Sequence, residues 1–402
     1  MADDTLETAV KGARIDLLGL VLKTGSLMVV TLGLYSFWAR TRLRRWLWSS
    51  VRPGGMPLEY TGQPLEKLIG FFVAAVLLVF YVGLVMMLIL FASLNLTGDT
   101  TPGFIAALAL ILPLYFIAQY RGRRYLVNHT SWRGLTFSME PGAFGYMWRA
   151  FLYYGLAIAS LGLLLPLATF RLRKFMVDRT WFGDQPFFQS GRFTMLYAAY
   201  LPFLVFGLAT IGLPAAASFN GTPGNLGWLF ITVPGMVFGW IYYRVASFRM
   251  LMSETLYSGG TELEIHPRTG KIIKIHLLGN LIIFLILSIL VPILVAMLFA
   301  IFGALGASLP SQDILTEEFS LGALFNLPEW IILASTILIY FSFFVLRAQF
   351  KHVFVTFPML RHAAETLLVH DASVIAATRR GADHHMADAD GLAGFFDFGG
   401  GI

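Results

Sequence analysis

The feature that most constrains the fold of this chain is a set of long stretches with no charged side chain. Residues 193–243 form 51 consecutive positions without Asp, Glu, Lys or Arg, and residues 68–98 and 275–312 form two further runs of this kind. A helix of about 20 predominantly apolar residues is enough to cross a bilayer. Because 57% of the whole chain is also hydrophobic, the runs predict an integral membrane protein with several transmembrane helices.

Composition also excludes some classes of protein. The formal net charge is +6, but the Lys and Arg residues flank the apolar segments and no nucleic-acid-binding pattern is present, so we expect no nucleic-acid partner. The absence of Cys excludes disulfides, thiolate metal ligands and Cys nucleophiles. Residues 1–13 lean acidic and lack the apolar core of a secretory signal peptide, so we expect none.

Eight apolar segments follow one another along the chain. They span residues 17–39, 68–93, 103–120, 144–170, 194–218, 226–246, 276–306 and 327–350. The connecting regions fall into two groups, because some carry four to six Lys or Arg each and the others carry none. The basic group consists of residues 39–67, 121–143, 171–193, 244–275 and 347–402. Since basic loops stay in the cytoplasm, we expect this group and the C-terminus there, and the loops without Lys or Arg outside.

Segment 144–170 does not fit a simple alternation, because both of its flanking loops are basic. If it crossed, every later loop would violate the charge rule. We therefore expect it to enter and leave on the cytoplasmic side, or to lie in the interface. Segment 17–39 is similar, with Gly33 and Gly162 in matching Leu-Gly-Leu sequences that interrupt the two segments. The alternative is that 144–170 is an ordinary crossing helix at which the charge rule fails.

The predicted fold is an all-α polytopic membrane protein. It has about six crossing helices in three hairpins, and two broken or re-entrant apolar segments. Alternating stretches after the basic loops, at residues 56–60, 135–137 and 261–275, predict short cytoplasmic β-hairpins that are able to pair into one platform. The predicted domains are a first membrane repeat unit (1–143), a second one (144–275), a third helical hairpin (276–350) and a cytoplasmic tail (351–402).

A basic motif recurs just after the apolar segments. It reads Arg-x-Arg-[Arg/Lys]-aromatic, with a Thr-like position six residues after the third basic residue and then Gly. The three strong copies contain Arg42, Arg44 and Arg45 before Val51; Arg121, Arg123 and Arg124 before Thr130; and Arg171, Arg173 and Lys174 before Thr180. Two less complete copies of the motif contain Arg244 and Arg249 before Thr255, and Arg361 before Thr366. This recurrence predicts an internal repeat.

The motif has two interpretations. Arg clusters beside membrane helices commonly fix topology and contact anionic headgroups, at about 1 kcal/mol per basic residue. Alternatively, the clusters converge and capture an anionic lipid or solute, for which the bidentate geometry of Arg is well suited. In either case we expect anionic lipid headgroups as partners, whereas the sequence says nothing about a protein partner or a homo-oligomer.

Few other residues predict a site. Ionisable residues inside the apolar segments lie near segment ends, where a long basic side chain reaches the interface, and this disfavours a proton relay. Gly235 and Gly239 form a small-xxx-small pair that predicts close helix packing. The His362–Glu365 pair and the tail cluster at 383–390 have weak metal-ligand spacing, so we expect no metal and no cofactor. No zinc-protease, P-loop or G-x-S-x-G motif occurs, so no catalytic residue is predicted.

Two segments resemble a known family. The run from Thr31 to Arg45 (TLGLYSFWARTRLRR), with Glu59-Tyr60-Thr61-Gly62 after it, is similar to the YjgN-like family of bacterial inner-membrane proteins. The tail sequence at 390–397 resembles the Gly-Leu-Ala ending of that family. The resemblance implies a multi-pass bacterial plasma-membrane protein of a family whose function is unknown, and it carries over no catalytic or binding residues.

We expect a non-enzymatic role in the bacterial inner membrane. Broken apolar segments beside Arg clusters favour transport or binding of an anionic lipid or small amphiphile within the bundle. A non-catalytic membrane scaffold or assembly partner is the alternative. An intramembrane lipid-modifying enzyme is a third hypothesis, but paired carboxylates and His clusters are lacking at membrane depth, and this counts against it.

Overall fold

The computed structural model describes residues 5–219, 226–258, 261–306 and 329–370, together with residues 375 and 377–379. By their contacts, the residues group into two units. Unit 1 consists of Met1–Lys11, Arg44–Ile272 and Arg361–Ile402, and unit 2 consists of Gly12–Leu43 and Ile273–Leu360. Every described strand lies in unit 1. The four domains predicted from the sequence remain a prediction.

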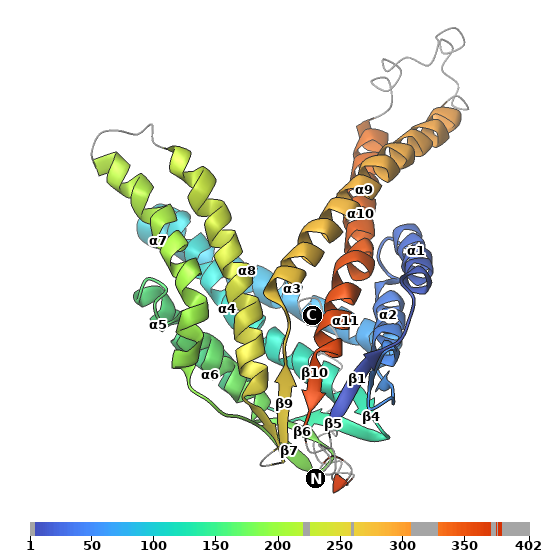
Figure 1. Ribbon diagram of the computed structural model, residues 1–402. Helices are drawn as coiled ribbons and strands as arrows, with labels where there is room; N and C mark the ends of the chain where they lie inside the picture. The colour runs from blue at the N-terminus through green and yellow to red at the C-terminus, as the bar shows by residue number, and fades with distance from the viewer. Residues whose placement is uncertain are drawn as a thin grey trace. The chain divides into compact units, whose positions relative to one another are not determined.

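The described elements follow a regular order of strand, helices, strand (Figure 1). They are β1 (Leu6–Val10), α1 (Arg14–Val30), α2 (Ser36–Ser50) and β2 (Val51–Pro53); β3 (Leu58–Tyr60), α3 (Pro64–Thr97), α4 (Thr101–Asn128) and β4 (Thr130–Trp132); β5 (Leu135–Met139), α5 (Ala143–Ala159), α6 (Leu165–Val177) and β6 (Thr180–Phe182); β7 (Gln185–Gln189), α7 (Tyr197–Phe219), α8 (Leu229–Ser253) and β8 (Thr255–Tyr257); and β9 (Thr261–Ile265), α9 (Thr269–Gly306), α10 (Glu329–Lys351), α11 (Phe357–Glu365) and β10 (Leu367–Val369).

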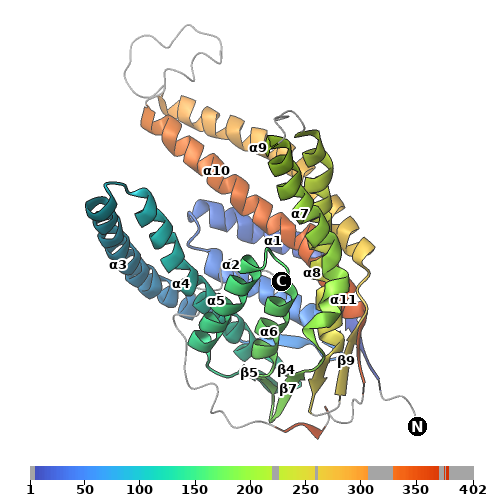
Figure 2. The same ribbon diagram turned by 90° about the vertical axis from the view of Figure 1, so that its left-hand side faces the viewer.

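Six of the described helices are long and apolar enough to cross a membrane, as the sequence predicts. They are α3, α4, α7, α8, α9 and α10. Local sequence explains the ends of α3: Pro64 occupies the first turn, where its missing N–H is not needed, and Gly98 ends the helix with φ of 70°. α3 packs beside α4, and α7 beside α8 (Figure 2). Large apolar side chains such as Val79 and Phe80 are exposed on α3, which is typical of helices that face lipid.

The two remaining helix pairs, α1–α2 and α5–α6, are short and lie outside these six candidate spans. Each pair is one apolar segment broken at the same type of turn. Leu32 and Leu161 have φ of 50° and 51°, and Gly33 and Gly162 both have φ of 91°. In both turns the hydroxyl of the residue before this Leu, Thr31 or Ser160, accepts a hydrogen bond of 3.0 Å from the backbone N–H four residues later.

All ten strands of the described residues form one antiparallel sheet, in the order β2-β1-β10-β9-β8-β7-β6-β5-β4-β3. Neighbours in the sheet are neighbours in the chain, except that the first strand pairs with the last, at Leu6 and Val369. The two edge strands, β2 and β3, also lie next to each other. The sheet carries one apolar core, which includes Leu6, Trp132, Phe182, Tyr257 and Val369.

This sheet corrects two expectations. The all-α class is wrong, because the described residues contain ten strands, although these strands do join into one sheet, as the expected platform requires. The hairpin expected over residues 261–275 is also wrong, since β9 ends at Ile265 and pairs with β8 and β10. After Pro267 the carbonyl of Arg268 accepts hydrogen bonds from the N–H groups of Lys271 and Ile272, so the chain starts α9 instead of a return strand.

Close helix packing at Gly235 and Gly239 is visible in unit 1. A Cβ atom at Gly239 would lie 2.7 Å from the backbone of Phe203 on α7, and one at Gly235 would lie 2.4 Å from the ring of Phe206. Nearer the sheet, Tyr200 of α7 and Tyr243 of α8 belong to one buried cluster. The absence of a side chain at the two glycines thus lets α8 lie directly against α7.

Candidate anion-binding site

The Thr-like position of the basic motif lies where a helix passes into a strand. Val51, Thr130, Thr180 and Thr255 each begin a strand, and Thr366 precedes β10 by one residue. A Thr hydroxyl at this position donates to the helix carbonyl four residues earlier. The distances are 2.8 Å for Thr130, 2.9 Å for Thr180, 2.7 Å for Thr255 and 3.0 Å for Thr366. The Thr therefore closes the end of the helix, and its role is structural.

The third basic residue of each strong copy is bound to the backbone after the motif. Arg45 donates to the carbonyl of Gly62 at 3.2 Å, Arg124 to that of Met139 at 2.9 Å, and Lys174 to that of Gln189 at 2.6 Å. Lys174 also pairs with Asp178 at 3.1 Å. These three side chains fasten the ends of their helices to the main chain that follows the motif.

Sequence reasoning missed a second fastening in the same place. The backbone N–H of Met139 donates to Asn128 Oδ1 at 2.8 Å, and that of Gln189 donates to Asp178 Oδ1 at 2.9 Å. Asn128 and Asp178 each stand two residues before the Thr of their motif copy. This shared spacing of a short polar side chain is the signal that could have revealed them.

The first basic residues of the three strong copies belong to three different helices, α2, α4 and α6. Arg42 belongs to unit 2, where its guanidinium lies 5.7 Å from the ring centroid of Tyr35. Arg121 is half-buried on α4, and Arg171 is exposed on α6. The structure shows no ion pair for these three residues within its described ranges. A common anion site for these three residues therefore stays a prediction.

The middle residues of copies two and three, Arg123 and Arg173, are different. Arg173 is half-buried on α6, and its Nε atom is buried without a hydrogen-bond partner in the described part of the chain. Its Nη2 atom lies 2.9 Å from the sulfur of Met252, a weak acceptor, and its guanidinium lies 5.6 Å from the ring centroid of Phe248. In copy one, Arg44 instead lies over the ring of Tyr60, at 5.8 Å.

Arg123 and Arg173 are close enough for their charges to repel each other. Burial, and then the positive charge of Arg123, lower the pKa of Arg173 to about 10. The same charge acts on Tyr146 of α5, whose pKa is nevertheless raised because burial dominates. No carboxylate of the described residues lies within ion-pair distance of either Arg. We call Arg123 and Arg173 the basic pair, since the charge of one acts on the other and neither is paired with a carboxylate of the described residues.

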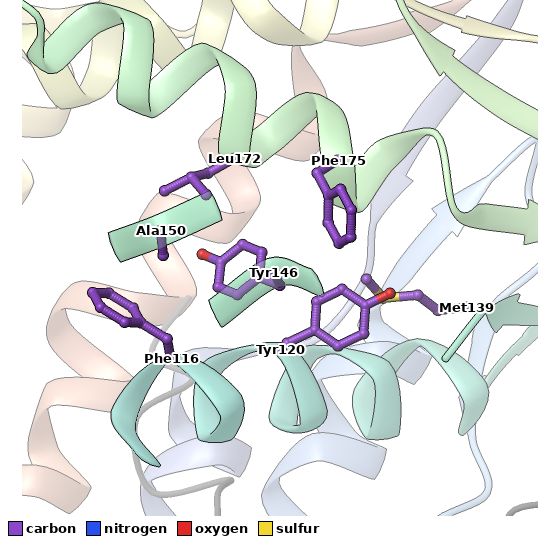
Figure 3. Close-up of a cluster of buried hydrophobic side chains, with 7 residues drawn as sticks. All are labelled: Phe116, Tyr120, Met139, Tyr146, Ala150, Leu172 and Phe175. Atoms are coloured by element: carbon purple, nitrogen blue, oxygen red, sulfur yellow. The ribbon is translucent and has the colours of Figure 1, made fainter. Parts of the chain in front are cut away.

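A buried aromatic cluster fixes the helices that carry this pair (Figure 3). Phe116 and Tyr120 of α4, Tyr146 of α5 and Phe175 of α6 pack together in it, and Tyr120 and Tyr146 are at most 2% exposed. The Tyr120 hydroxyl donates to the carbonyl of Glu140 at 2.7 Å, and the Tyr146 hydroxyl donates to Gln119 Oε1 at 2.8 Å. Arg123 follows Tyr120 by three residues and Arg173 precedes Phe175 by two, so both are anchored to this cluster.

The described residues contain no group of three or more His, Asp or Glu that could hold a metal ion. The His and Asp cluster expected at 383–390 lies outside the described ranges. His362 accepts a 3.0 Å hydrogen bond from the backbone N–H of Arg268, which makes it part of the packing between α11 and the start of α9.

A family model described as "Bacterial protein of unknown function (DUF898)" matches residues 5–225, which confirms the resemblance to the YjgN-like proteins of the same family. Neither the curated proteins nor the solved structures give a match.

Proposed function

The chain belongs to the bacterial DUF898 family, and from this premise we propose that it is a membrane protein that binds an anionic group at Arg123 and Arg173. The ligand is the phosphate or carboxylate of a lipid, a small amphiphile or a solute. The observation that carries the proposal is the basic pair itself, in which two mutually repelling guanidinium groups have no carboxylate among the described residues.

Physical chemistry supports an anion at this position. A buried polar group without a partner is unfavourable, and a guanidinium offers donors in a planar fork that matches phosphate and carboxylate oxygens. An anion between the two residues satisfies the buried Nε of Arg173 and removes the repulsion from Arg123. Phe248 and Met252 of α8 add an apolar side to the Arg173 environment, which favours an amphiphile.

The proposed orientation follows from the charge rule and the sheet. All strong motif copies end at strands of one sheet, and their basic residues favour the cytoplasm for that side. The anion site then lies at the cytoplasmic end of the membrane helices. The α1–α2 and α5–α6 pairs enter and leave on that side, and the five strand–helices–strand units are internal repeats.

Native mass spectrometry of the full-length protein in mild detergent tests the proposal. The protein is offered inorganic phosphate, a fatty acid, phosphatidylglycerol and phosphatidylcholine in turn. We expect an anionic adduct whose affinity falls about tenfold or more in Arg123→Gln/Arg173→Gln, because each charge-assisted hydrogen bond is worth on the order of one tenfold step. Binding of phosphate alone would identify a solute site, whereas binding of the fatty acid and phosphatidylglycerol would identify a lipid-type site.

The matched control is Arg121→Gln/Arg171→Gln, which removes the same charge from the same two helices. It should leave the adduct unchanged. Equal loss in both double variants would reduce the effect to overall charge, and absence of any selective adduct would favour the membrane scaffold.

A further inference from the structure

A groove lies between α9 and α10 in unit 2, and its lining includes neither Arg123 nor Arg173. It has a volume of about 530 Å³, and its lining includes Asn280, Phe284, Ser288, Pro292, Phe343 and Arg347. Both views show α10 beside α9 (Figures 1 and 2). A volume of this size is within the range of about 300–1,000 Å³ that is common for ligand pockets. We name it the α9–α10 groove.

One end of the α9–α10 groove is basic. Arg347 is exposed and has no ion pair or hydrogen bond within the described residues. Lys274 lies near the N-terminal end of α9, and Lys351 is the last residue of α10. α9 contains no acidic residue, and the single acidic residue of α10, Glu329, is at its opposite end. This end therefore attracts an anion.

The rest of the groove is apolar and long. On α9 its lining residues recur every three or four positions from Asn280 to Pro292, which is one face of a helix. At about 1.5 Å per residue, these 12 steps span roughly 18 Å along α9. The Ser288 hydroxyl already donates a hydrogen bond to the carbonyl of Leu285 at 2.9 Å, so it does not need a hydrogen-bond acceptor from a ligand. A single extended hydrocarbon chain fits such a surface.

We propose that the α9–α10 groove holds one anionic phospholipid, with its phosphate at Arg347 and Asn280 and one acyl chain along α9 towards Pro292. Asn280 donates one N–H to the carbonyl of His276 at 2.8 Å, which leaves its second N–H and its oxygen for the headgroup. Charge selects the headgroup, because a zwitterionic lipid brings its own cation to the basic end. This inference is independent of the function proposed for Arg123 and Arg173.

Photo-crosslinking of the full-length protein in phosphatidylcholine vesicles tests this inference. The vesicles contain either phosphatidylglycerol or phosphatidylcholine with a photoreactive acyl chain, and labelled peptides are mapped by mass spectrometry. We expect phosphatidylglycerol to label the peptides around 280–292 and 343–347 more strongly than phosphatidylcholine does. Arg347→Gln should lower that labelling about tenfold, and Lys274→Gln, which removes a charge beside the groove without touching its lining, should change it little.

A second variant addresses the acyl chain. Ser288→Trp places a bulky ring in the exposed middle of the groove and should abolish labelling there by both lipids, while the unfolding temperature stays near that of the wild type. Equal labelling by both lipids in the wild type, labelling confined to other peptides, or full labelling in Arg347→Gln would overturn the inference. Arg123→Gln/Arg173→Gln should keep groove labelling, so failure of one site is distinguishable from failure of the other.

Discussion

At the residue scale, one repeated motif places its basic side chains in different environments. The third residue donates to a main-chain carbonyl 15 or 17 residues further on, whereas the middle residue in two copies forms the basic pair. The sequence predicts a group of nine basic residues but does not separate these roles. Every residue has a main-chain carbonyl, so the acceptor of such a hydrogen bond cannot be recognised from the sequence. The proximity of Arg123 to Arg173 depends on how α4, α5 and α6 pack.

His129 provides a pH test at this scale. It caps α4, its ring stacks on Tyr125 with centroids 4.0 Å apart, and its Nε2 lies 4.0 Å from Glu66. Burial lowers the pKa of His129 despite the carbonyl of Tyr125 and the charge of Glu66, which both act to raise it. The folded protein therefore resists a proton that the unfolded chain accepts below about pH 6.5.

The stability linked to His129 is fully present above that pH. It should decrease as the pH falls from about 6.5 through the lower pKa of the folded state, because the unfolded chain binds the proton first. Thermal unfolding of detergent-solubilised protein at a series of pH values measures the effect. His129→Gln should flatten the curve in this window, and an unchanged slope would show that other groups control it.

At the element scale, the apolar segments and both breaks agree with the sequence, because long charge-free runs and Leu-Gly-Leu interruptions are local signals. The sheet did not follow from the sequence to the same extent. Its strands are three to five residues long, which is too short for a clear alternation. Its pairing also joins residues as distant as Leu6 and Val369. Only the packing of the whole of unit 1 supplies that information.

The turn between α5 and α6 allows a test with an internal control. Gly162 has φ of 91° and its carbonyl accepts a hydrogen bond of 2.8 Å from the Tyr200 hydroxyl. Gly162→Ala should lower the free energy of unfolding by roughly 1–2 kcal/mol, because a Cβ atom is strained in left-handed backbone. Gly155→Ala, inside α5 with open space at its Cβ position, should raise it by up to about 1 kcal/mol.

Unfolding followed by intrinsic fluorescence measures both variants. If the two substitutions shift the unfolding transition in the same direction, the backbone of the turn is not what limits Gly162.

At the scale of the whole molecule, the sheet gives a reason for the misfit of segment 144–170 with the charge rule. β5 and β6, which precede and follow the α5–α6 pair, are hydrogen-bonded neighbours, as Phe137 and Phe182 show. A segment whose two ends join neighbouring strands returns to its starting side. The basic loops on both sides of it are then expected on the same face of the membrane.

Because the chain has no Cys, single introduced Cys residues can test this arrangement. Met56→Cys and Asp184→Cys lie in the β2–β3 and β6–β7 turns, and Thr100→Cys lies between α3 and α4; all three positions are exposed. With a membrane-impermeant maleimide, we expect the first two to react in inverted vesicles and Thr100→Cys to react in intact spheroplasts. Asp184→Cys reacting together with Thr100→Cys would mean that the α5–α6 pair crosses.

The pairing of the first strand with the last also determines when, during synthesis of the chain, the sheet can be completed. β1 can pair with β2 early, but its other edge has no partner until β10 has been synthesised, 363 residues after Leu6 (369 − 6 = 363). At about 5–20 residues per second, this wait lasts roughly 20–70 s. During that time the membrane helices emerge one pair at a time while an unpaired strand edge stays open. A ribosome that stalls just after residue 365, where α11 ends, therefore leaves all the described helices made and the sheet without its final strand.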